Sequence, residues 1–228
     1  LEIPSLEIQK KYVAIYEAML ANMRSYEKGL EELKLICDCY IENIKNTYTA
    51  KRIGEFIKNE SVKNVDNLNL DIVGISKEQK LISSDSKTKG VDKKKYYILE
   101  PYHFVFSPIH INEGSIAYND SNNRYLISPI YKTFTILNTS NLDANYLSLW
   151  FSRKEFVRYC WFYAFARDTF DWQNLCDVII PIPPLSVQKS ISEIYNNYKM
   201  RKLQVEKIRQ TLAVICPVLV RGSILESR

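Results

Sequence analysis

Five lysines gather in one polar, glycine-bearing stretch of the chain, residues 82–95. They are Lys87, Lys89, Lys93, Lys94 and Lys95. Clustered lysines neutralise backbone phosphates and release the counterions around nucleic acid, which favours binding and makes it depend on salt. A run of charged residues is equally typical of a solvated surface loop. The stretch is therefore a candidate DNA-contacting loop, with a plain surface loop as the alternative.

A second candidate lies between residues 153 and 172, where basic and aromatic residues interleave. The basic residues are Arg153, Lys154, Arg158 and Arg167, and the aromatic ones are Tyr159, Trp161, Phe162, Tyr163, Phe165, Phe170 and Trp172. Most of these aromatic residues are expected to pack in the core, as aromatic stripes on helices usually do. Arg167, Asp168 and Thr169 are the exception, because arginine, carboxylate and threonine side chains suit base edges and phosphates. We expect these three residues to form an exposed loop that contacts DNA.

The sequence contains no arrangement typical of a catalytic centre or a bound cofactor. Its six glycines are isolated, so no glycine-rich loop for a phosphate or a methyl donor is present. A magnesium-dependent nuclease needs clustered carboxylates near a lysine, but Glu100 is isolated and no lysine follows Asp168 or Asp171. His103 and His110 lie in or beside apolar runs, which favours structural or surface roles. We predict a non-catalytic protein without a cofactor.

Composition sets wider limits on the class of protein. The net charge of +5 and the pI of about 8.8 permit a nucleic-acid partner without requiring one. The five cysteines are odd in number and include no pair with metal-ligand spacing, so reduced cytoplasmic thiols and no metal site are expected. There is no run of about 18 apolar residues, so no membrane span is expected.

An internal repeat frames the chain and indicates how these candidates are positioned. Residues 3–45 align without a gap onto residues 182–224, an offset of 179, and twelve of the 43 aligned positions are identical. The identities begin with Ile-Pro-x-Leu-x-x-Gln-Lys in both copies. Two copies of one element therefore flank a unique middle segment, and such repeats set the architecture of a protein.

Each copy is predicted to form a long helix of roughly 35–40 residues, about 55 Å in length. Pro4 and Pro183 precede the helix starts, where proline is favoured. Apolar residues recur at alternating steps of three and four in both copies, which is a heptad pattern. We expect the two helices to pack against each other as an antiparallel coiled coil, and packing of each on a separate partner chain is the alternative. Pro217 predicts that the second helix kinks or stops near Cys216.

The middle segment, residues 46–181, has the texture of a mixed domain in which strands dominate. Short runs rich in β-branched and aromatic residues are separated by turn formers. These runs are Leu70–Ile75, Tyr96–Leu99, Phe104–Ser107, Ser115–Tyr118, Tyr131–Leu137 and Val178–Ile182. Residues 52–56 suggest a short helix or strand, and a helix capped by Ser140 or Asn141 is expected to continue to about Tyr163. The predicted fold class is α+β: one β-rich domain flanked by two long helices that form an antiparallel coiled coil.

With these parts placed, the chain resembles the specificity (S) subunits of type I restriction-modification enzymes over nearly its whole length. The motifs that carry the resemblance are the two helix junctions, Ile3–Gln9 and Ile180–Gln188, and two stretches of the middle domain, Ile111–Ile116 and Leu126–Tyr131. The resemblance implies a first conserved helix at 1–46, a target-recognition domain at 47–181 and a second conserved helix at 182–228. It also implies that the middle domain binds double-stranded DNA.

The chain departs from the family in one respect. The family usually carries two recognition domains and two helices, whereas one domain between two helices is visible here. The chain is therefore a fragment, a truncated product, or a half-subunit that completes itself as a homodimer, and the sequence does not choose among these.

The resemblance further implies a function and partners. The chain would read one half of a bipartite DNA site in the cytoplasm and dock methyltransferase (modification) subunits, which methylate adenine with S-adenosylmethionine. A motor and nuclease (restriction) subunit would join the complex. Two alternatives remain: the C-terminal recognition region of a fused restriction-methylation enzyme, and a coiled-coil adaptor that binds only proteins.

Overall fold

The computed structural model describes residues 3–84, 90–167 and 170–227. The chain divides into two compact units. The first unit consists of Leu1–Glu42 and Glu193–Arg228, and the second of Asn43–Ser192. These divisions lie a few residues from the domain limits expected at 46/47 and 181/182, which stay a prediction.

The first unit is built from two long helices, α1 (Leu6–Thr47) and α5 (Leu185–Glu226), apart from the end of α1 and the start of α5, which belong to the second unit. Each has 42 residues, and both ends of α5 lie 179 residues beyond the corresponding ends of α1. The offset of the sequence repeat is thus also the offset of the helices. At 1.5 Å per residue each helix is about 63 Å long, somewhat longer than the sequence analysis predicted.

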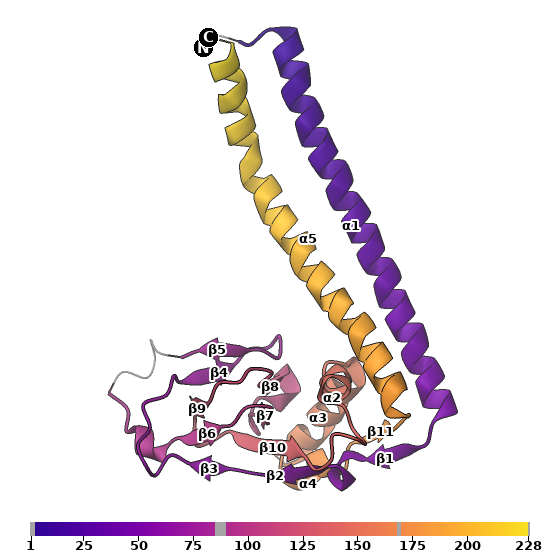
Figure 1. Ribbon diagram of the computed structural model, residues 1–228, viewed down its shortest axis with the longest axis vertical. Coiled ribbons are helices and arrows are strands. Elements are labelled where there is room, and N and C mark those ends of the chain that lie inside the picture. The colour runs from indigo at the N-terminus through magenta and orange to yellow at the C-terminus, as the bar shows by residue number, and fades with distance from the viewer. Residues whose placement is uncertain (1–2, 85–89, 168–169, 228) are drawn as a thin grey trace. The chain divides into compact units, whose positions relative to one another are not determined.

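Within the first unit, α1 and α5 run side by side in opposite directions (Figure 1). Lys11 near the start of α1 contacts Glu226 at the end of α5, with 2.6 Å between Nζ and Oε1. Further along, both Nε and Nη2 of Arg209 donate to Oε1 of Glu27, at 3.0 and 2.7 Å. The seam between the helices buries Val205 and Leu212. The predicted antiparallel helix pair is confirmed.

Pro217 does not end the second helix. Helix α5 continues through it to Glu226, so of the two outcomes expected near Cys216, a kink or a stop, the stop is wrong. Proline removes one backbone hydrogen bond and crowds the preceding turn. Here Leu212 and Ser223 are buried on either side of the proline, and we infer that this packing holds the helix together across it.

Helix α5 also differs from the expectation that no segment suits a membrane. One 18-residue window of α5 is long and apolar enough to cross a bilayer, by length and composition only. This is weak evidence, because the same helix carries Arg209 and Glu226, which form ion pairs with α1.

The second unit contains eleven short strands among the described residues, and all the pairs between them are antiparallel. A four-stranded sheet has the order β2-β10-β7-β8, and a three-stranded sheet the order β3-β6-β9. The pairs β1-β11 and β4-β5 complete the set. The strands are β1 (Ala50–Arg52), β2 (Ile57–Asn59), β3 (Val62–Lys63), β4 (Val73–Ile75), β5 (Leu81–Ser83), β6 (Tyr97–Leu99), β7 (Phe104–Phe106), β8 (Ile116–Tyr118), β9 (Tyr125–Ile127), β10 (Lys132–Ile136) and β11 (Ile179–Pro181).

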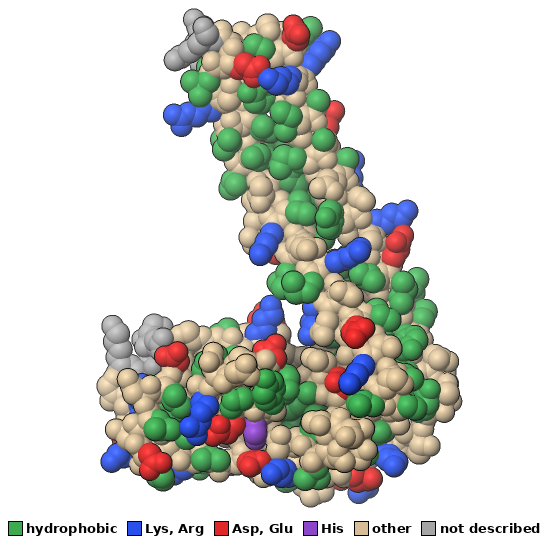
Figure 2. Space-filling model, viewed as in Figure 1, with side chains coloured by type: hydrophobic (Ala, Val, Ile, Leu, Met, Phe, Trp, Pro, Cys, Tyr) green, Lys and Arg blue, Asp and Glu red, His purple; other side chains and the backbone are tan. Residues whose placement is uncertain are grey.

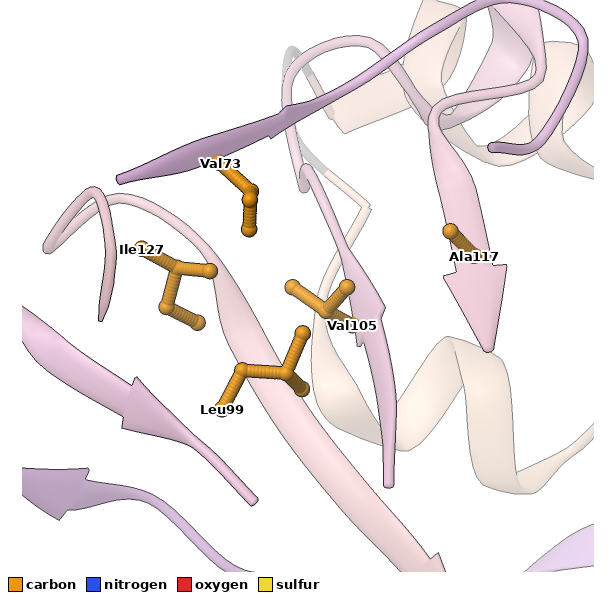
Figure 3. Packing of buried hydrophobic residues seen from close by; sticks show 5 residues of the cluster. All are labelled: Val73, Leu99, Val105, Ala117 and Ile127. Atoms are coloured by element: carbon orange, nitrogen blue, oxygen red, sulfur yellow. The ribbon is translucent and has the colours of Figure 1, made fainter. Parts of the chain in front are cut away.

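The core of this unit lies where these small sheets meet. Figure 3 shows its aliphatic part, made by five buried residues: Val73, Leu99, Val105, Ala117 and Ile127. Because successive strand residues point to opposite faces, Phe104 and Phe106 flank Val105 and pack elsewhere. The ring of Phe104 stacks on that of Phe134 with 4.9 Å between centroids. Small antiparallel sheets around a buried core fit the predicted domain, in which strands dominate.

Three α-helices lie between β10 and β11 along the chain: α2 (Ala144–Phe151), α3 (Lys154–Arg167) and α4 (Trp172–Cys176). The prediction of a single helix up to Tyr163 is therefore wrong, because α2 ends at Phe151 and a separate helix begins at Lys154. The Ser152 hydroxyl donates to the carbonyl oxygen of Leu149 at 2.6 Å, and such local bonding competes with continued helix. The start is also later than expected, since Asp143 caps α2 by accepting from the Tyr146 amide at 2.9 Å.

Strands β1 and β11 bring the two ends of the second unit together. Residue Lys51 lies opposite Ile180, and the Ile182 amide donates to the Thr49 carbonyl oxygen at 3.2 Å. The chain therefore enters the unit just after α1 and leaves it just before α5 as a paired ribbon. A 3₁₀ helix, Ile53–Glu55, follows β1 where the sequence suggested a short helix or strand.

Candidate nucleic-acid interface

The lysine-rich stretch is only partly described. Lys87 and Lys89 lie outside the described residues. Lys93, Lys94 and Lys95 form a 3₁₀ helix, and Asp92 caps it by accepting from the Lys94 amide at 3.1 Å. The cap therefore fixes the backbone from which these three lysine side chains project.

The three described lysines are not equivalent. Nζ of Lys93 donates to Oδ1 of Asn69 at 2.7 Å and to the Leu70 carbonyl oxygen at 3.1 Å. It is therefore bound to its own unit. Lys94 and Lys95 are exposed, and Nζ of Lys95 is 4.0 Å from Asp92. An exposed ion pair of that kind contributes little, so both ammonium groups can bind a phosphate.

A buried asparagine fixes the base of this lysine segment. Asn64 is fully buried, and its Nδ2 donates to the carbonyl oxygens of Leu68 and Lys93, at 3.1 and 3.2 Å. Its Oδ1 accepts from the Leu68 amide at 2.8 Å. The side chain thus ties two separate chain segments to each other, which positions Lys94 and Lys95 on a stable support.

The second predicted contact, Arg167–Thr169, lies largely outside the described residues. Helix α3 ends at Arg167, whose side chain is not described, and neither Asp168 nor Thr169 is described. The chain that follows is anchored. Phe170 is fully buried and its amide donates to the Pro108 carbonyl oxygen at 3.2 Å.

Glu100 and Asp171, two of the carboxylates weighed for metal-dependent chemistry, have structural partners, and the third, Asp168, lies outside the described residues. Asp171 forms a capping box with Asn174 at the start of α4. Glu100 accepts a hydrogen bond from Arg124 at 2.7 Å. Within the described ranges, no group of three or more His, Cys, Asp or Glu residues is placed to hold a metal ion.

The two histidines differ in burial. The His103 side chain is mostly buried, with Nδ1 2.9 Å from the Pro101 carbonyl oxygen and Nε2 3.4 Å from Oε2 of Glu60. A hydrogen bond from Lys58, and a weaker one from His103, lower the pKa of Glu60. His110 is exposed beside Glu113. Both positions fit the structural or surface roles expected from the sequence.

The outer face of α3 was missed by the sequence analysis. Most aromatic residues of this stretch were expected to pack in the core, without a distinction between individual positions, but Trp161 and Phe162 are 53% and 70% exposed. Lys154 and Arg158 are exposed on the same helix. The spacing of these four residues along a helix was the available signal, since positions three and four apart share a face.

The sequence also did not reveal what the repeated glutamine does. Gln188 is fully buried at the start of α5. Its Oε1 accepts from the Asp143 amide at 2.8 Å, and its Nε2 donates to the carbonyl oxygens of Asn141 and Pro183, at 2.9 and 2.8 Å. The side chain therefore joins three segments: the proline-containing linker, the start of α2 and the first turn of α5.

Comparison with known proteins yields structural matches only. No protein-family model matches the chain, and no curated protein does so. The HsdS subunit from Thermoanaerobacter tengcongensis superposes with a TM-score of 0.55 at 14% identity, covering 97% of this chain and 57% of that one. The S subunit of a type I restriction-modification system from M. genitalium superposes with a TM-score of 0.59 at 11% identity, covering 96% of this chain and 61% of that one.

A third match is a chain from a structure describing complex assembly and conformational transition of the type I R-M system. Its TM-score is 0.52 at 14% identity, and the match covers 99% of this chain and 60% of that one. The chain thus spans about three fifths of the length of these solved proteins. Over nearly its whole length, this chain has the fold of the S subunits of type I restriction-modification systems.

Proposed function

We propose that this protein is a DNA-reading component of a type I restriction-modification system and recognises one half of a bipartite site. The observation that carries the proposal is the shared offset of 179 between the sequence repeat and the two 42-residue helices around one β-rich unit. The fold common to three solved structures of type I systems supports it.

The second unit, Asn43–Ser192, is the part proposed to contact DNA. Lys94 and Lys95 would bind backbone phosphates and fix the register, together with Lys87 and Lys89. Arg167, Asp168 and Thr169 would approach base edges or phosphates. Lys93 would act mainly by holding the segment, because its ammonium group is bound to Asn69 and the Leu70 carbonyl oxygen.

The helix pair is proposed to act as a spacer and a docking surface for methyltransferase subunits. Figure 2 shows hydrophobic side chains at the surface of the paired helices. Eight such residues are more than half exposed: Leu6, Val13, Leu35, Met200, Val214, Val218, Val220 and Leu225. Exposed apolar residues that gather into a contiguous patch are typical of a protein interface.

The chemistry of modification and restriction would belong to the partner subunits. On this proposal the chain is non-catalytic and works in the cytoplasm. The methyltransferase subunits would methylate adenine with S-adenosylmethionine, and a motor and nuclease subunit would complete the restriction complex. If the chain is a half-subunit, a second copy would supply the other half-site.

The proposal is tested by sequencing the methylated adenines of a host that expresses this chain with its methyltransferase subunits. We expect methylation within a two-part motif that disappears when this chain is deleted. A motif that persists without the chain would overturn the proposal. A chain that binds the subunits but no duplex DNA at any salt concentration would favour the protein-only adaptor instead.

A further inference from the structure

One face of α3 exposes two cationic side chains and two aromatic rings to solvent. Lys154, Arg158, Trp161 and Phe162 are exposed. Arg158 lies four residues after Lys154, and Trp161 and Phe162 lie three and four residues after Arg158. Residues at such spacings project from the same side of a helix. They form what we call the α3 stripe.

The opposite face of α3 is firmly packed, so the exposure of the stripe is built into the fold. Phe156 and Cys160 are buried, and the ring of Phe156 lies 4.8 Å from that of Phe151. The Tyr159 hydroxyl donates to the Asn174 carbonyl oxygen at 2.7 Å. Rotating the helix to bury Trp161 or Phe162 would expose these residues and break this bond.

The charge on the stripe is positive. Glu155 is the neighbouring acid, and its Oε1 lies 2.7 Å from Nη2 of Arg153 and 3.1 Å from Nζ of Lys45. Its negative charge is therefore compensated by these two cations. A partner that binds this face would therefore contact the positive charges of Lys154 and Arg158. These charges complement a polyanion.

The combination of cationic and aromatic side chains narrows the class of partner further. Ammonium and guanidinium groups bind phosphates, and exposed aromatic rings pack on sugars and bases, as they do in nucleic-acid-binding proteins. A purely acidic protein surface would use the cations but leave both rings in water. Duplex DNA offers phosphates beside the apolar C–H surfaces of its sugars and the thymine methyl groups at its base edges.

We propose that the α3 stripe is a further DNA contact, with Lys154 and Arg158 on backbone phosphates and Trp161 and Phe162 against sugars and bases at a groove edge. The inference rests on the proposed function, and it extends the contact surface away from Arg167, where α3 ends. The DNA contacts in the proposed function come only from the lysine segment and from residues 167–169.

Salt-dependent binding of a random-sequence duplex to the full chain tests the two cations. Replacing both Lys154→Gln and Arg158→Gln should make the plot of log affinity against log salt concentration shallower by about two, one for each lost phosphate contact. The matched control is Lys51→Gln, an exposed lysine on β1, which should leave the slope unchanged.

The rings are tested separately at fixed salt. Trp161→Ala with Phe162→Ala should weaken binding about ten-fold while leaving the salt slope unchanged, because apolar packing of the rings on sugars and base edges releases no counterions. The control Leu137→Ala removes a side chain that is 55% exposed elsewhere in the unit and should bind normally.

A direct readout is available from the fluorescence of Trp161. Trp150 is 7% exposed and Trp172 is half-buried, so quenching by acrylamide reports mainly on Trp161. Added DNA should protect the emission from acrylamide, and Trp161→Phe should abolish that protection in a folded protein.

Two outcomes would overturn the inference while leaving the proposed function intact. One is a wild-type chain that binds DNA without protection of Trp161, together with stripe variants that bind normally. The other is that the stripe variants keep their affinity for DNA but no longer bind methyltransferase subunits. That result would make the stripe a protein interface. A wild-type chain that binds no duplex would instead defeat the proposed function itself.

Discussion

Gln9 and Gln188 donate the same hydrogen bond, each from Nε2 to the carbonyl oxygen of a proline five residues earlier, at 2.7 and 2.8 Å. The two residues are equivalent in the internal repeat, so the repeat preserves a contact as well as a sequence. At the second junction Gln188 also reaches Asn141 and Asp143. The glutamine thus fixes the angle at which the linker turns into the helix, and at Gln188 it also fixes the start of α2.

Replacing Gln188 should destabilise the second unit. Gln188→Ala removes three hydrogen bonds, one buried and two partly buried, and leaves their backbone groups without this partner, so the free energy of unfolding should fall by about 2–4 kcal/mol. Urea unfolding followed by circular dichroism measures the change. Gln9→Ala is the matched control, with one bond at a partly exposed site and an expected loss of about 0.5–1 kcal/mol. Equal effects at both positions would contradict the assigned role.

A pH-dependent contribution is expected from Glu155. Burial would raise the pKa of its carboxyl group, but hydrogen bonds from Arg153 and Lys45 outweigh it and lower the pKa to about 2. The folded pKa lies below the ordinary value of 4.5. The carboxylate therefore stabilises the fold fully above about pH 4.5, and this stabilisation is lost as the pH falls toward 2.

The comparison of wild type with Glu155→Gln tests this sign. The wild type should be more stable at pH 6, and its advantage should shrink steadily as urea unfolding is repeated at lower pH. Glu55→Gln, at an exposed carboxylate of the same unit, is the control for general acid effects. An advantage that grows on acidification would show that the assigned hydrogen bonds do not govern this group.

Much of the fold was readable because the repeat is long and the helices obey local rules. Pro4 and Pro183 marked the helix starts, and the heptad pattern indicated that α1 and α5 would pair. All six strands expected from the sequence contain an observed strand. Five others were missed, because two or three residues are too few for an alternating pattern to emerge: β1, β2, β3, β5 and β9.

The candidate interface was less predictable, since exposure depends on packing. Helix α3 has aromatic residues on several sides, so its sequence does not state which of them face the core. Only the packing of Phe156 and Cys160 shows that Trp161 and Phe162 point to solvent. In the same way, a run of lysines does not reveal that Lys93 is bound to its own unit. The interaction that distinguishes Lys93 is with Asn69, 24 residues away.

The lysines should therefore separate into two kinds when mutated. Charge reversal at Lys94 and Lys95 should weaken DNA binding and flatten its salt slope by about two, because both ammonium groups are exposed and each neutralises one phosphate. Fluorescence anisotropy with a random-sequence duplex measures both quantities. Lys93→Met should instead lower thermal stability with a smaller change of slope. An unchanged slope in the Lys94 and Lys95 variant would remove those two residues from the interface.

The length of the helix pair should set the spacing of the DNA site. One heptad inserted into each helix at the level of the Glu27–Arg209 pair keeps the apolar seam in phase and lengthens the rod by about 10 Å. At 3.4 Å per base pair, the gap between half-sites should grow by about three base pairs. Sequencing of methylated adenines in a host carrying the variant reads the new gap. The control exchanges Glu32, an exposed residue of α1, for Gln without changing helix length, and its gap should match the wild type. A gap that stays constant in the longer variant would rule out the helix pair as the ruler, because no other element changes length in that experiment.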